Sequence, residues 1–152
     1  MLTANKKTKQ RAAGAAFAII ASQYNARYVD AMLRAAKREL VRGGAKVTVI
    51  RVPGAYEIPV VTARLARGGK YSGLICLGVI LRGATTHAQH IGEAVSNALV
   101  QIQVTYEVPV IHEVLLLENA RQAEERCLSR THNRGTEAAQ TALAMALVMR
   151  GL

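Results

Sequence analysis

The sequence of 152 residues contains no tryptophan, one phenylalanine and two cysteines. Because large rings are scarce, a hydrophobic core must consist of aliphatic side chains and alanine, which favours close packing of its elements. Cys76 and Cys127 lack the C-x-x-C spacing of metal and redox motifs. We therefore expect free thiols, with no disulfide, in a reducing cytoplasmic compartment, and Cys76 is expected to be a buried small hydrophobe.

Three motifs that often identify a function are also absent. The fingerprint G-x-G-x-x-G, the phosphate loop G-x-x-x-x-G-K-[ST] and the elbow G-x-S-x-G do not occur. The usual support for dinucleotide binding, nucleoside triphosphate binding and serine-hydrolase chemistry is therefore missing. No apolar run has the length of a membrane span, so we expect no membrane partner.

The composition is that of a globular protein with an excess of positive charge. Hydrophobic residues make up 51% and charged residues 20%, and the formal net charge is +10. Part of this excess lies near the N-terminus, in Lys6, Lys7, Lys9 and Arg11. We expect residues 1–13 to be a basic disordered tail and residues 14–152 to be a single domain. The remaining excess suits an anionic substrate and does not require nucleic acid.

The N-terminal stretch also has some features of a signal peptide, because basic residues precede the apolar run 12–21. No small-x-small cleavage site ends that run. The second half of the run is also the first strand of the predicted sheet. We therefore favour a basic tail followed by a buried strand.

Short apolar runs alternate with helical patterns along the chain. Buried strands are predicted at residues 15–22, 46–52, 73–81 and 108–117. Helices are predicted at 27–41, 59–66, after His87 to about 106, 120–128 and 136–149. Asn25 is a candidate cap for the first helix. The alternation predicts a three-layer α/β fold with a four-stranded parallel sheet.

Ligands in such sheets bind at the carboxyl ends of the strands. Polar corners follow the four predicted strands, at residues 23–25, 54–57, 82–87 and 117–119. The third corner, R-G-A-T-T-H, places a glycine-containing turn before a helix, where backbone N–H groups and the helix dipole favour an anion. Thr85 and Thr86 add hydroxyl donors, Arg82 precedes them, and His87 is a candidate general acid or base.

A metal site is the weaker interpretation of the same segment. His87 and His90 are three residues apart, and Glu93 or His112 could be invoked as a third ligand. Such spacing is common by chance, so we predict no metal.

Two longer motifs carry a resemblance to a known family. V-P-G-A-Y-E-I-P at 52–59 and G-V-I-L-R-G-A-T-T-H at 78–87 resemble the 6,7-dimethyl-8-ribityllumazine synthase family of riboflavin biosynthesis. Further matches lie at the family's spacing, at 23–25, 108–110, 118–119, 122–123, 125–126, 133–135 and 137–139. The resemblance covers about residues 14–150 and implies a flavodoxin-like fold.

The resemblance also implies a reaction that needs no cofactor. In this family 5-amino-6-(D-ribitylamino)uracil condenses with 3,4-dihydroxy-2-butanone 4-phosphate to give 6,7-dimethyl-8-ribityllumazine. An imine forms, phosphate leaves and the ring closes. The alternatives are a weak or inactive shell-forming protein that binds lumazine or flavin, and a flavodoxin-like binder of nucleotides or nucleic acid. We expect the enzyme, with no nucleic-acid partner.

The roles of individual residues follow from the matched motifs. His87 is implied as the proton shuttle, and Arg134 and Glu137 as supporting residues. The phosphate is assigned to Gly83, Ala84, Thr85 and Thr86, with Arg126 contributed by a neighbouring subunit. The pyrimidinedione and ribityl chain are assigned to Tyr24, Asn25, Ala55, Tyr56, Glu57, Ile80, Leu81 and His112.

Family members form pentamers with active sites between adjacent subunits, and many assemble twelve pentamers into an icosahedral shell. The link 129–135 carries no insertion that would obstruct such packing, so we expect the 60-subunit shell, with riboflavin synthase as a possible enclosed partner. Two segments depart from the family pattern. Ala88-Gln89-His90 replaces an aromatic and an acid, and His112-Glu113 replaces the Phe-Gly of many members, which implies a more polar pocket wall.

Overall fold

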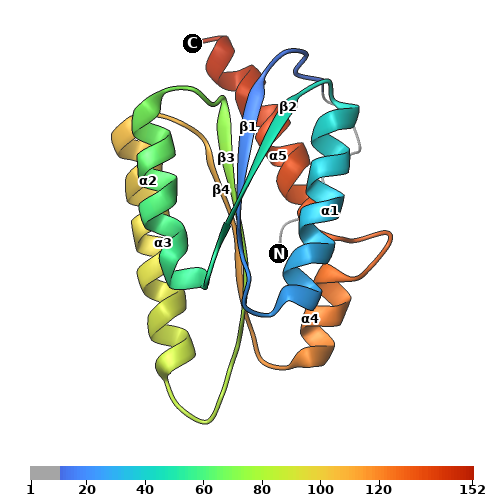
Figure 1. The fold of residues 1–152 in the computed structure, drawn as a ribbon, viewed down its shortest axis with the longest axis vertical. Coiled ribbons are helices and arrows are strands. Elements are labelled where there is room, and N and C mark those ends of the chain that lie inside the picture. The colour runs from blue at the N-terminus through green and yellow to red at the C-terminus, as the bar shows by residue number, and fades with distance from the viewer. Residues whose placement is uncertain (1–10) are drawn as a thin grey trace.

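The computed structural model describes residues 11–152, and strands and helices alternate along them in the predicted order (Figure 1). Where the sequence predicted both ends of an element, the observed ends agree within two residues. The elements are β1 (Ala16–Ser22), α1 (Ala26–Arg42), β2 (Lys46–Val52), the short 3₁₀ helix η1 (Ala55–Glu57), α2 (Ile58–Gly68), β3 (Gly73–Leu81), α3 (His87–Tyr106), β4 (Val110–Leu117), α4 (Ala120–Cys127) and α5 (Arg134–Arg150).

The strands form one parallel sheet in the order β2-β1-β3-β4. Helices α2 and α3 cover one face, and α1, α4 and α5 cover the other (Figure 1). The predicted three-layer, flavodoxin-like α/β fold is therefore confirmed. All four carboxyl ends lie at the same edge of the sheet, at the lower end of Figure 1.

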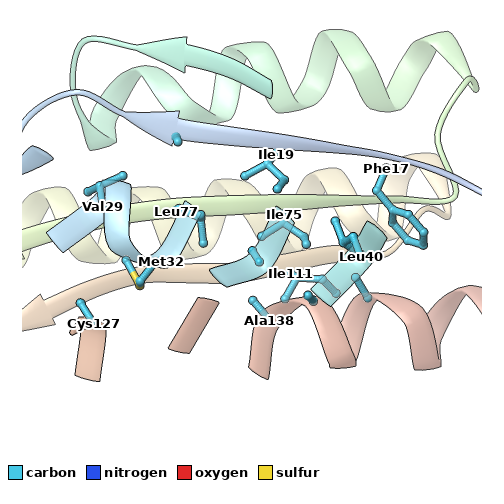
Figure 2. Close-up of a cluster of buried hydrophobic side chains, with 14 of the residues drawn as sticks. Phe17, Ile19, Val29, Met32, Leu40, Ile75, Leu77, Ile111, Cys127 and Ala138 are labelled. Atoms are coloured by element: carbon cyan, nitrogen blue, oxygen red, sulfur yellow. The ribbon is translucent and has the colours of Figure 1, made fainter. Parts of the chain in front are cut away.

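The core is aliphatic, as the scarcity of aromatic residues predicted. Between the sheet and helices α1 and α5, side chains such as Phe17, Met32 and Leu77 are fully buried (Figure 2). Helix α5 contributes mainly small side chains to this layer: Ala138, Ala139, Ala142 and Ala146. These alanines allow α5 to approach α1 and the sheet closely.

Both cysteines are buried and free. Burial raises the pKa of the Cys76 thiol to about 12 and that of Cys127 to about 11, because the thiolate loses its hydration. The two thiols are therefore protonated at neutral pH and serve as small core residues.

The predicted tail, residues 1–13, lies mostly outside the described residues. Its boundary is wrong, however, because Ala12 is buried and belongs to the core. The Ala12 N–H donates to the carbonyl oxygen of Gly43 at 3.0 Å, and Gly14 N–H donates to Gly44 at 3.1 Å. The folded chain thus begins before residue 14, where it pairs with the turn that ends α1. Among the described helices, none is long and apolar enough to cross a membrane.

Candidate active site at the carboxyl edge of the sheet

A groove of about 1000 Å³ lies at the carboxyl ends of β1, β2 and β3. Ten of the predicted site residues line it: Tyr24, Asn25, Ala55, Tyr56, Glu57, Ile80, Leu81, Gly83, Thr85 and His87. They come from three separate corners of the chain. The parallel sheet brings them together because it places these strand ends side by side.

The first corner is held in place by the backbone of its neighbour β2. Gln23 N–H donates to Val52 O at 2.8 Å, and Tyr24 N–H donates to Pro53 O at 3.1 Å. The ring of Tyr24 remains 74% exposed at the groove. An aromatic face that the fold leaves uncovered on a tethered backbone is suited to stacking on a flat heterocycle.

Asn25 does not cap α1 with its side chain, contrary to the prediction. It occupies the N-cap position in the left-handed conformation, with φ of 57° and no side-chain cap bond. Its Nδ2 instead donates to the carbonyl oxygen of Val79 on β3, at 2.7 Å. Asn25 therefore ties the first corner to the strand that leads into the third.

The second corner supplies an acceptor. After Gly54 the chain forms η1, and Pro59 then lies in the first turn of α2. Glu57 is exposed and its carboxylate lies close to Gly54, within the groove. A carboxylate in this position accepts hydrogen bonds from hydroxyl groups.

The third corner carries the predicted anion site. Helix α3 begins at His87, with Thr86 at the N-cap position and no side-chain cap bond. Thr85 Oγ1 accepts from the His87 N–H at 3.3 Å, and Thr86 Oγ1 lies 3.3 Å from His90 Nε2. Ala84 and Thr86 are exposed in this loop but are not among the residues that line the groove.

Arg82 is directed away from this groove. Its Nε lies 3.0 Å from Glu118 Oε1, and its side chain lines a separate hollow of about 510 Å³ between α3 and β4. Of the residues that line the main groove in the described part of the chain, none is lysine or arginine. An anion in a single subunit would therefore meet N–H groups, hydroxyls and imidazoles but no permanent cation.

Four other predicted residues lie outside the groove of their own subunit. His112 is exposed on the edge strand β4, and its Nε2 lies 2.7 Å from Ser96 Oγ on α3. Its Nδ1 accepts from the Val114 N–H at 3.1 Å, and desolvation lowers the pKa of its imidazole. Arg126 is exposed on α4, and Arg134 and Glu137 lie in the first turn of α5.

His112 and Glu113 do not form a polar wall together, contrary to the prediction. Adjacent residues of a strand point to opposite faces, and Glu113 is buried on the α5 side with 7% exposure. Its Oε2 lies 3.2 Å from Arg134 Nε, and Arg134 Nη1 lies 2.9 Å from Glu137 Oε2. Sequence reasoning missed this partly buried network, although an acid within an apolar strand was the available signal.

His90 also lines the groove, although the sequence favoured His87 as the general acid or base and made His90 the weaker candidate. Its position one turn after Thr86 on α3 was the signal that could have placed it there. Within residues 11–152 no three or more His, Cys, Asp or Glu side chains gather closely enough to hold a metal ion.

Comparison with known proteins gives a consistent result. The family model described as 6,7-dimethyl-8-ribityllumazine synthase matches residues 14–150. A 6,7-dimethyl-8-ribityllumazine synthase of Stenotrophomonas maltophilia (strain R551-3) is 40% identical over 134 residues, covering 86% of each chain. One of Xylella fastidiosa (strain 9a5c) is 39% identical over 145 residues, covering 93% of this chain and 94% of the relative. One of Xanthomonas campestris pv. campestris (strain B100) is 38% identical over 138 residues, covering 89% and 90%.

The family match spans nearly the whole chain, and the relatives are matched over most of their own length. The resemblance drawn from the two long motifs is thereby confirmed. The chain belongs to the 6,7-dimethyl-8-ribityllumazine synthase family of enzymes of riboflavin biosynthesis.

Proposed function

We propose that the protein condenses 5-amino-6-(D-ribitylamino)uracil with 3,4-dihydroxy-2-butanone 4-phosphate, without a cofactor, and releases 6,7-dimethyl-8-ribityllumazine and phosphate. One observation carries the proposal. Residues that match the family motifs converge on one groove although they lie far apart in sequence: Tyr24, 55–57, Ile80, Leu81, Gly83, Thr85 and His87.

The two ends of the groove suit the two substrates. The exposed ring of Tyr24 stacks on the pyrimidinedione, and Ile80 and Leu81 form an apolar wall beside it. Glu57 accepts hydrogen bonds from ribityl hydroxyls. The turn at 83–86 and the first N–H groups of α3 hold the phosphate of the ketone.

His87 moves protons during imine formation and during the loss of phosphate. Its side chain lies in the groove beside Thr85, next to the proposed phosphate. Positioning of the two substrates supplies most of the rate enhancement, because no strongly activated nucleophile lines the groove in the described chain.

The site is completed by a second subunit. A phosphate dianion favours a bidentate arginine, and residues 11–152 of one subunit place no arginine or lysine in the lining of the groove. The exposed Arg126 on α4 of a neighbouring subunit supplies it. Helix α3 has the features of a subunit interface. Val100 and Val104 are 54% and 67% exposed, and Glu93 is the one charged residue (Asp, Glu, Lys or Arg) among its 20 residues. We propose a cytoplasmic pentamer that forms 60-subunit shells able to enclose riboflavin synthase.

The proposal is tested by mixing the purified protein with both substrates and following lumazine absorbance and fluorescence. We expect product at saturating substrate, and we expect His87→Ala to slow turnover while leaving measurable activity. Absence of product would overturn the proposal. Binding of lumazine or riboflavin without turnover would instead favour the inactive shell protein on the same scaffold.

A further inference from the structure

The contact between Thr86 and His90 gives the third corner a second imidazole beside His87. Both rings line the groove, and Thr86 Oγ1 lies 3.3 Å from His90 Nε2 across one turn of α3. Neither Thr86 nor His90 is covered by the rest of the subunit. His90 therefore faces the groove, and the exposed Thr86 hydroxyl lies beside it at the edge of the groove.

The two threonines of this corner differ in what their hydroxyl groups can do. Thr85 Oγ1 accepts from the His87 N–H, so its own proton can point to a ligand. Thr86 has a single hydroxyl proton, and a neutral His90 with its proton on Nδ1 accepts that proton at Nε2. In this state Thr86 has no proton to offer an anion.

Protonation of His90 reverses the direction of this hydrogen bond. The added proton resides on Nε2 and is donated to Thr86 Oγ1, which frees the threonine hydroxyl to donate to a phosphate oxygen. The imidazolium also places one positive charge in a groove whose lining contains no lysine or arginine within the described chain. An anion at the corner therefore favours the protonated ring.

Several other charged and titratable groups face this corner, and all of them are common to the unmodified protein and a variant of His90. The proposed function also brings Arg126 of a neighbouring subunit to the phosphate, and its guanidinium keeps its charge at neutral and at mildly acidic pH. Across the groove lie Tyr24, Tyr56 and Glu57, and on α3 itself lies His87. Glu93, three residues further along α3, lies in the other hollow, and its Oε1 accepts from Gln89 Nε2 at 2.9 Å.

We propose that His90 is a positioning residue that turns Thr86 into a phosphate donor, so that binding of the phosphate end of the substrate is coupled to protonation of the His90 ring. The proposal rests on the proposed function, because that function places the phosphate at this corner.

Sulfate is a suitable probe, because it remains a dianion across the working range and any proton taken up must go to the protein. Its binding is measured by isothermal titration at pH 6 and pH 8, in two buffers of different ionisation enthalpy. For the unmodified protein we expect roughly ten-fold tighter binding at pH 6 than at pH 8. By proton linkage this corresponds to an uptake of about half a proton on average over the range.

His90→Gln is the informative variant, because glutamine keeps a polar partner for Thr86 but cannot be protonated. We expect it to lose most of the pH dependence and of the proton uptake, with an unchanged midpoint of thermal unfolding. His132→Gln, at an exposed position in the link before α5, is the matched control and should behave as the unmodified protein. Full pH dependence in His90→Gln would overturn the inference.

A double-mutant cycle tests the route through Thr86. If His90 acts through the hydroxyl, adding His90→Gln to Thr86→Val changes sulfate affinity at pH 6 by less than about two-fold. Additive effects would show that His90 acts independently. Failure of sulfate to compete with the four-carbon phosphate would overturn both the anion site and this inference. Normal turnover of the unmodified protein, together with the same pH dependence of sulfate binding in His90→Gln as in the unmodified protein, would overturn this inference alone.

Discussion

At the scale of the residue, the dipeptide His112-Glu113 shows how one position along a strand changes a side chain's role. His112 lies at the exposed edge and bonds to Ser96, whereas Glu113 is enclosed with Arg134 and Glu137. Burial raises the pKa of Glu113 to about 7, because the loss of hydration outweighs the stabilisation of its charge by Arg134. Glu113 therefore titrates within the physiological range.

This pKa makes a prediction about stability. The raised pKa means that the folded protein holds the Glu113 proton more tightly than the unfolded chain, whose carboxyl has its ordinary pKa of 4.5. The stability that this group contributes is fully present below about pH 4.5 and is lost as the pH rises through about 7. In Glu113→Gln we expect this loss, on the order of 3 kcal/mol, to disappear from urea unfolding measured at intervals from pH 4.5 to 8.

Glu124→Gln is the control for that measurement. Glu124 forms a surface ion pair with Arg27, and such exposed pairs have little effect on stability. Its pH profile should follow that of the unmodified protein. Equal slopes for Glu113→Gln and the unmodified protein would show that Glu113 does not titrate as described.

At the scale of the element, the start of α5 depends on close approach to α1. Asn133 caps α5 by accepting from the Gly135 N–H at 2.8 Å, so the helix begins two residues earlier than the predicted residue 136. A Cβ at Gly135 would overlap the carbonyl oxygen of Met32 and would lie 2.6 Å from its carbonyl carbon. Because both groups belong to backbone, neither can move without separating the two helices.

Gly135→Ala is therefore expected to destabilise the protein by about 3 kcal/mol or more, or to prevent folding. Gly68→Ala is the matched control, because Gly68 ends helix α2 with nothing within 4 Å of its Cβ position. That control should be neutral or slightly stabilising. Urea unfolding followed by circular dichroism compares the two, and a loss below about 1 kcal/mol in Gly135→Ala would contradict this packing.

At the scale of the whole molecule, the groove lining formed by the described residues contains no lysine or arginine, which predicts that neighbouring subunits share a site. His87→Ala and Arg126→Ala subunits should each have low activity alone. When the two are co-expressed in equal amounts, random neighbours restore one intact site in about four, and roughly a quarter of full activity should return. Steady-state turnover of the mixed assemblies, sized by sedimentation, measures this recovery.

Recovery no greater than the average of the two separate variants would contradict the shared site. Arg121→Ala is the control, because Arg121 lies on the same helix, α4, and pairs with Glu125 on that helix. It should retain full activity alone. Its mixture with His87→Ala should have about half of full activity, the simple average of the two variants, because every intact His87 then meets an intact Arg126.

The sequence by itself determined the fold class, the strand-to-helix corners and the family. Alternating apolar runs and helical patterns are local signals, and V-P-G-A-Y-E-I-P with G-V-I-L-R-G-A-T-T-H form local corners, so both could be recognised without knowledge of distant contacts. The aliphatic core also followed from composition alone. The convergence of Tyr24, Glu57 and His87 on one edge was predictable because parallel strands end together.

Only the tertiary structure decided which partners the polar side chains take. Asn25 bonds to Val79, 54 residues away, instead of capping its own helix. Arg82 turns to Glu118 and leaves the anion corner, and Glu113 is enclosed by α5. These contacts depend on strand register and on how the helices pack against the sheet. No local sequence pattern specifies either one, because a side chain's partner is set by the distance between elements and not by its neighbours in sequence.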